Sequence, residues 1–165
     1  MTDIKNVKSK ELKVGRTNIL LNTLMVFVGI SGCFSVLFGA WLAHGGQALP
    51  TNAQSSLATA LQYQFIHTLA LFITLLWIKV SRLKIGEVTA ASTISVIQVK
   101  SSKLLMSACL AFVTGILCFC GVIYIKSLFE LTEPFMVLSK LTPLGGIAFA
   151  IAWLLLAVAG KRSFN

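Results

Sequence analysis

The chain has 165 residues, of which 56% are hydrophobic and only 12% are charged. This is the length of one domain, and the composition lies outside the range of soluble globular proteins. The net charge of +9 comes without interleaved aromatic and basic residues or a recognised binding motif, so we do not expect nucleic acid as a partner.

Four long apolar stretches predict four transmembrane helices, at residues 19–43, 57–78, 104–125 and 142–160. A bilayer core about 30 Å thick needs about 20 apolar residues in a helix. A soluble bundle would carry a polar stripe along each helix, but these stretches are apolar on all sides. We therefore expect an all-α integral membrane bundle over residues 18–160, with helices that alternate up and down.

The first stretch is too long for the apolar region of a signal peptide, and no small-residue cleavage site follows it, so we expect it to be retained. Its glycines recur at helical spacing, and small residues let membrane helices approach closely. We expect packing within the bundle, with self-association as the alternative. The glycines expected to pack are Gly29, Gly32, Gly39, Gly121, Gly145 and Gly146.

The first connection is broken by glycines and by Pro50, and Thr51 or Asn52 is placed to cap the helix that follows. The second connection, at about 79–103, has no clear periodicity. It is compatible with a short strand, an amphipathic surface element or a loop. Pro143 stands near the start of the fourth stretch, where a missing N–H is tolerated.

Positive charge is concentrated on one side of the four stretches. Twelve of the 14 Lys and Arg residues fall in the tail 1–17, the loop 79–103 and the tail 161–165; only Lys126 and Lys140 fall on the other side. Basic loops stay in the cytoplasm. We therefore expect a multi-pass protein of the bacterial inner membrane with both termini cytoplasmic, and with anionic lipids as partners of the mobile or surface-bound basic tail.

Polar side chains inside membrane spans are costly and usually face protein or water. Alternating helices would bring several of them to the non-cytoplasmic end. Tyr63, Gln64 and His67 are spaced three or four residues apart and share a helical face. The candidate cluster consists of His44, Gln62, Tyr63, Gln64, His67, Tyr124 and Thr142.

Three interpretations of this cluster remain open. It can be structural, with hydrogen bonds that join helix ends. It can handle a small ligand, a quinone or a proton, because histidine titrates near neutral pH. The third interpretation is a haem held by His44 and His67, although we predict no cofactor.

No catalytic residue or metal site is predicted. The five acidic residues lie outside the spans, and no nucleophile elbow or phosphate loop is present. The four cysteines lack metal-ligand spacing and are expected to pack as small apolar residues.

The chain resembles the small inner-membrane proteins typified by YgdD and YwdK, which form domain-of-unknown-function family 423, and it is similar to eukaryotic transmembrane protein 256. The motifs that carry the resemblance are Ser31-Gly32, Gly39-Ala40-Trp41-Leu42-Ala43-His44, Tyr63-Gln64-Phe65-Ile66-His67-Thr68-Leu69-Ala70, Phe119-Cys120-Gly121-Val122-Ile123-Tyr124 and Thr142-Pro143-Leu144-Gly145-Gly146, with Trp153 beyond them.

The sequence departs from the family pattern where Leu42 replaces a glycine and where Cys120 and Val122 replace serines. The resemblance implies a four-helix membrane protein and directs attention to the polar cluster, but it supplies no activity, substrate or cofactor. We therefore expect a non-enzymatic structural or accessory subunit, which associates with other membrane proteins or with itself.

Overall fold

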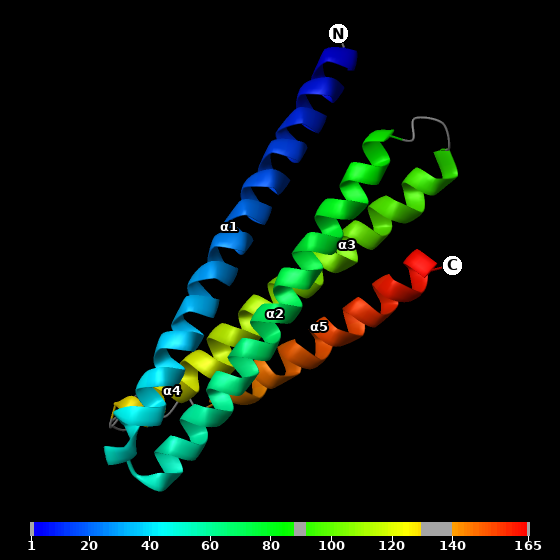
Figure 1. The fold of residues 1–165 in the computed structure, drawn as a ribbon. Coiled ribbons are helices and arrows are strands. Elements are labelled where there is room, and N and C mark those ends of the chain that lie inside the picture. Colours follow the sequence, from blue (N-terminus) through cyan, green and yellow to red (C-terminus); the bar gives the residue numbers. More distant parts are fainter. Residues whose placement is uncertain (1, 88–91, 130–139, 165) are drawn as a thin grey trace.

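The computed structural model describes residues 2–87, 92–129 and 140–164, with side chains at 15–82, 103–129 and 140–163. These residues form helices joined by short turns, and no strand occurs among them (Figure 1). The elements are α1 (Thr2–His44), the short turn η1 (Gly46–Ala48), α2 (Thr51–Glu87), α3 (Ser92–Gly115), the π-helical turn η2 (Ile116–Gly121), α4 (Val122–Leu128) and α5 (Leu141–Phe164).

Four helical segments are long and apolar enough to cross a membrane, which confirms the predicted class. They are Gly15–His44, Thr51–Arg82, Lys103–Leu128 and Leu141–Ser163. The third segment runs through α3, η2 and α4 without leaving the helical path.

The helices extend further than the apolar stretches. α1 runs back through the basic tail to Thr2, and α2 and α3 extend into the second connection, as far as Glu87 and from Ser92. A strand there is thus excluded for the described residues. Nucleation is the costly step of helix formation, and Lys, Leu and Glu, which occur in these extensions, propagate an existing helix at little cost.

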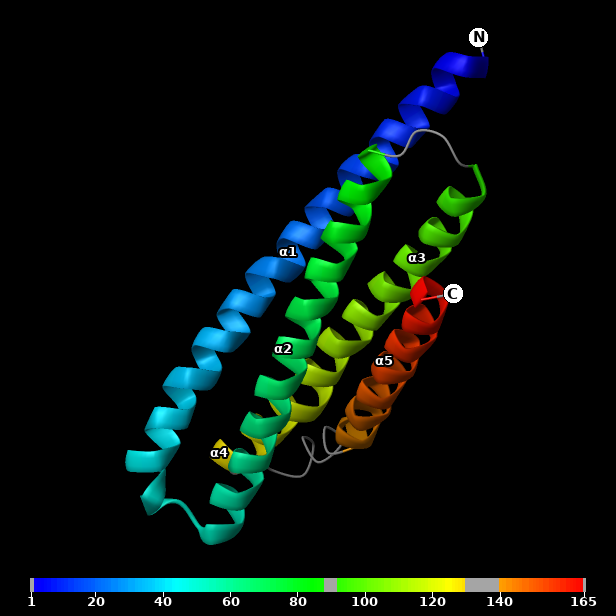
Figure 2. The ribbon, with the colours of Figure 1, turned by 45° about the vertical axis from the view of Figure 1, so that its right-hand side comes forward.

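The four long segments lie side by side in the order α1, α2, α3, α5 (Figures 1 and 2). α1 packs mainly on α2, and α5 packs mainly on α3 and η2. The outer helices are consequently poorly covered. Only 17% of the most apolar part of α1 and of α5 is buried, against 44% for the two inner spans.

The core lies between α2 and α3. Leu57 and Leu71 of α2 and Leu105 and Phe112 of α3 are fully buried. Tyr124 and Phe149 extend this core into α4 and α5.

The π-helical turn η2 interrupts the third span between Gly115 and Gly121. Such turns widen the helix locally and are frequent at functional sites. Gly145 of α5 lies directly against it: a Cβ atom there would be 2.5 Å from the backbone nitrogen of Phe119. η2 is therefore a point of close backbone approach between α5 and the third span.

Consecutive spans run in opposite directions (Figures 1 and 2). The start of α1, the end of α2, the start of α3 and the end of α5 lie toward one end of the molecule, and η1 and α4 lie at the other. The first end carries Arg16, Arg82, Lys103 and Arg162. The basic residues that the sequence places in separate segments therefore lie at the same end of the folded bundle.

Candidate functional site

His67 lies in the middle of α2, 16 residues after the first residue of the span Thr51–Arg82 and 15 before the last. The sequence prediction placed it in the first turns of the span. The helix begins at Thr51, more than four turns earlier. The site is therefore near the centre of the span rather than at its end.

The His67 ring is buried among aromatic rings from α3 and α5. It stacks on Phe149 with a centroid distance of 3.6 Å and an interplanar angle of 15°. Phe112 and Trp153 lie 5.8 and 6.2 Å away. Phe149 in turn rests on Gly115, where a Cβ atom would overlap its ring. The side chain thus joins α2 to α3 and α5 through ring contacts.

The tautomer of His67 follows from its hydrogen bond. Nδ1 lies 2.6 Å from the carbonyl oxygen of Tyr63, one turn earlier. A carbonyl oxygen only accepts, so Nδ1 donates, and in the neutral ring Nε2 is left as an acceptor. Nε2 makes no hydrogen bond within the described part of the chain. The hydrogen bond to Tyr63 therefore fixes the orientation of the His67 ring.

A second buried group joins α1 to α2. The amide of Gln64 donates to Ser31 Oγ at 3.0 Å and to the Ser31 carbonyl oxygen at 3.3 Å. The hydroxyls of Ser31 and Thr68 are 2.7 Å apart, and Ser35 Oγ donates to the Ser31 carbonyl oxygen at 2.9 Å. Ser31 is the centre of this network. Such bonds contribute about 0.6 kcal/mol each, up to about 1.7, in a membrane.

Tyr124 lies apart from both groups. Its ring makes edge contacts with Phe38 and Phe34 of α1, at 4.9 and 5.4 Å. The hydroxyl is buried and has no hydrogen-bond partner in the described residues. Tyr124 therefore packs α4 against α1 as an aromatic residue, and it does not share a network with His67.

The remaining candidates do not join these groups. His44 is exposed at the end of α1 and makes no hydrogen bond or ring contact within the described residues. Thr142 is half-buried in the first turn of α5, and Gln62 is exposed on α2. The structure thus brings together Tyr63 and His67, places Gln64 with Ser31, and leaves the other four candidates separate.

The geometry does not form a haem site between the two histidines. Ser31 lies opposite Gln64 and Thr68, and Gly39 lies opposite Leu61. Continuing this register places His44 opposite the first two turns of α2, about 18 Å along the helix axis from His67. Axial ligands must meet at one iron, so this pair does not fit.

No group of three or more His, Cys, Asp or Glu side chains able to hold a metal occurs in the described part of the chain. Cys109 and Cys120 are buried, and Cys33 is exposed on α1.

The glycines differ sharply in what surrounds them. A Cβ atom at Gly39 would meet Leu61 at 3.2 Å, and at Gly121 or Gly146 the nearest atom would be 3.9 Å away. At Gly29 and Gly32 nothing lies within 4 Å. These two glycines leave an open strip on the outer face of α1 near mid-span.

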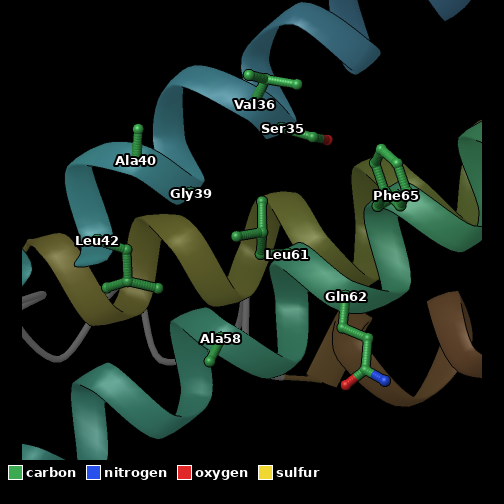
Figure 3. A pocket seen from close by; sticks show the side chains of 9 residues that line it. All are labelled: Ser35, Val36, Gly39, Ala40, Leu42, Ala58, Leu61, Gln62 and Phe65. Atoms are coloured by element: carbon green, nitrogen blue, oxygen red, sulfur yellow. The ribbon is translucent and has the colours of Figure 1, made fainter.

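A shallow groove of about 460 Å³ runs between α1 and α2 (Figure 3). Leu61 and Phe65 extend from the side of α2 that faces α1, whereas Gln62 extends away from α1. The lining residues are Ser35, Val36, Gly39, Ala40, Leu42, Ala58, Leu61, Gln62 and Phe65.

Sequence reasoning missed the partners of His67. Phe149 and Trp153 are four residues apart in the fourth stretch, a spacing that places two aromatic rings on one helical face. Phe112 and Phe119 lie on either side of Gly115, but no feature of the third stretch predicts a π-helical turn. The ring pair on the fourth helix is the signal that could have been used.

Comparison with known proteins places the chain among membrane proteins. Residues 38–146 match the family described as "Protein of unknown function (DUF423)". A UPF0382 membrane protein of Haemophilus influenzae is 33% identical over 143 residues, which cover 86% of this chain and 96% of that protein. The UPF0382 membrane protein YwdK of Bacillus subtilis is 31% identical over 144 residues, covering 86% and 98%. No solved structure matches.

Proposed function

The chain belongs to the DUF423 family, and we propose that it acts as a non-enzymatic accessory subunit, which packs laterally against another membrane protein through α1. The observation that carries this proposal is the open strip at Gly29 and Gly32, where no described atom outside the local helix backbone lies within 4 Å of a Cβ position.

The strip has the properties of a helix-packing surface. Small residues allow two helices in a membrane to approach closely, and van der Waals contact then drives their association. Cys33 is exposed beside Gly29 and Gly32, and Ile30 and Leu37 are 65% and 66% exposed on the same helix. A helix of another subunit would cover side chains that the chain itself leaves bare.

The interior of the bundle supports a structural role over a catalytic one. Ser31, Gln64 and Thr68 use their hydrogen-bonding groups on one another, and His67 is fixed by a backbone carbonyl and a stacked ring. The hydrogen bonds among Ser31, Gln64 and Thr68 stabilise one arrangement of α1 and α2 in a membrane interior. A partner protein would therefore bind at the exposed strip of α1 rather than in the interior of the bundle.

We expect Gly29→Leu to remove the partner without unfolding the bundle. The full-length tagged chain is extracted in mild detergent, and copurifying proteins are quantified by mass spectrometry. Because a Cβ atom at Gly29 has no described atom within 4 Å outside the local helix, we expect thermal stability to stay the same or to rise by about 1 kcal/mol, the difference in helix propensity.

The matched control is Ala150→Leu, at an exposed alanine of α5, which should retain the partner. Recovery of the unmodified chain as a bare monomer or a homo-oligomer would contradict the proposal. Equal recovery of the partner with Gly29→Leu would contradict the role of the strip.

The orientation we propose is that of an inner-membrane protein with both termini in the cytoplasm. Support comes from the basic residues gathered at one end of the fold, since Lys and Arg are retained on the cytoplasmic side. A fused reporter that is active only outside the cytoplasm should be active after Asn52 and inactive after Asn165. Activity after Asn165 alone would reverse the orientation.

A further inference from the structure

We propose that Asn18, Lys79 and Arg82 form a binding site for the phosphate group of an anionic phospholipid, where α1 meets α2 at the basic end of the bundle. Arg82 Nη1 donates a hydrogen bond to Asn18 Oδ1 at 3.2 Å. Lys79 lies three residues before Arg82 on α2, so the two side chains are neighbours on the helix surface. Two cations and one polar group from two helices are thereby placed together.

The hydrogen bond to Asn18 orients the charge of Arg82 without neutralising it. The accepting oxygen belongs to a neutral amide, and the bond uses one of the five N–H donors of the guanidinium. No Asp or Glu occurs in any of the four candidate spans. A guanidinium presents its donors as a planar fork that matches two oxygens of one phosphate. The remaining donors of Arg82 therefore fit a phosphate group.

The depth of the site suits a lipid headgroup. At this end of the bundle every span has a cation among its first or last two residues, namely Arg16, Arg82, Lys103 and Arg162. The apolar length of a span matches the hydrocarbon core of the bilayer, and the headgroups border that core. Long basic side chains near helix ends extend to this border. The cations are consequently placed at the level of the lipid phosphates.

The surrounding charge favours an anionic lipid over a zwitterionic one. The segments 1–17, 79–103 and 161–165 hold twelve Lys and Arg against three acidic residues, whereas the opposite end has two of each. The whole net charge of +9 therefore belongs to the basic end. Basic residues beside a span attract anionic lipids. A zwitterionic headgroup would bring its own cation into this positive surface.

The phosphate site is separate from the strip at Gly29 and Gly32. Gly29 lies 11 residues after Asn18 on α1, which is about 16 Å along the helix axis. A lipid headgroup at Arg82 and a partner protein on the strip therefore occupy different levels of α1. Binding of the lipid does not depend on the accessory role proposed above.

Lipid selectivity tests the proposal. Delipidated full-length protein in mild detergent is mixed with equal amounts of dioleoyl phosphatidylglycerol and dioleoyl phosphatidylcholine, and the bound lipids are counted by native mass spectrometry. We expect the unmodified chain to retain phosphatidylglycerol in excess. Arg82→Gln should retain about fivefold less of it, the effect of one cation near an anionic headgroup. The matched control, Lys126→Gln, removes an exposed cation at the opposite end and should retain as much as the unmodified chain.

Asn18→Ala tests the geometry apart from the charge. This variant keeps every cation but releases Arg82 from its hydrogen bond. It should retain about threefold less phosphatidylglycerol, the effect of losing one hydrogen bond. Unchanged retention would contradict the part of Asn18 in the site.

Lys79→Gln removes the second cation from an exposed position and takes the place of Arg82→Gln if that variant does not fold. Equal retention of the two lipids by the unmodified chain would overturn the proposal. So would equal losses from Arg82→Gln and Lys126→Gln. Displacement of the lipid by inorganic phosphate at the same concentration would show a site for a free anion instead, and an acidic protein that phosphatidylglycerol cannot displace would show a protein site.

Discussion

Gly145→Ala is expected to destabilise the bundle by about 1–3 kcal/mol, the usual cost of forcing an extra methyl group into a packed interior. The new Cβ atom would be 2.5 Å from the Phe119 nitrogen and 2.8 Å from the carbonyl carbon of Cys118. Contacts between such atoms are favourable at about 3.5–4.0 Å, so α5 would have to retreat by about 1 Å. The obstacle is backbone, which cannot rotate aside as a side chain does.

The neighbouring glycine provides the control. At Gly146 the nearest atom to a Cβ position is 3.9 Å away, in the Phe119 ring, which is an ordinary contact. Gly146→Ala should therefore be neutral or stabilise the helix by up to about 1 kcal/mol. Thermal unfolding of both variants in the same detergent measures the difference. Equal stability of the two would contradict the close approach of α5 to η2.

Gly115→Ala is expected to disturb the His67 site through the Phe149 ring. We again expect it to lower the free energy of unfolding by about 1–3 kcal/mol. The added methyl group would occupy the space of the Phe149 ring. That ring is only 3% exposed and is stacked on His67 at 3.6 Å. It can move away from position 115 only by giving up part of this stack.

A double-mutant cycle separates this effect from a general loss of helix packing. Phe149→Ala alone should cost about 3–5 kcal/mol. In that background, Gly115→Ala should cost nothing or stabilise by up to about 1 kcal/mol, because the obstructing ring is gone and alanine is the better helix former. An unchanged penalty in both backgrounds would show that the ring is not the obstacle.

Hydropathy was sufficient to predict the four spans, because crossing a bilayer requires a length of apolar helix whatever its packing. It could not predict their lateral order. In a soluble bundle a polar stripe marks the outer face, but lipid is as apolar as a protein core. α1 and α5 are apolar on all sides, so their sequences do not predict that these helices lie at the edges of the bundle.

The polar residues were predictable as a set but not as separate groups. Spacing along α2 correctly placed Tyr63 and His67 on one face, because it depends only on helical geometry. The partners of Gln64 and Tyr124 lie on α1. Which residues of α1 they contact depends on the register between helices, which spacing within one helix does not predict. The glycines show the same limit. Gly29 and Gly145 look alike in sequence, yet a Cβ atom at Gly29 has no described atom within 4 Å outside the local helix, and a Cβ atom at Gly145 meets backbone.

The π turn at η2 has a consequence for how the third span is compared among relatives. Closing a turn with one extra residue rotates all that follows by about 100° relative to an uninterrupted α-helix. The half before it, α3, packs on α5 and α2, and the half after it, α4, packs on α2 and contacts α1 through Tyr124. A relative with one residue fewer between Gly115 and Gly121 would turn the tyrosine away from α1, so residue-by-residue equivalence holds on each side of the turn but not across it.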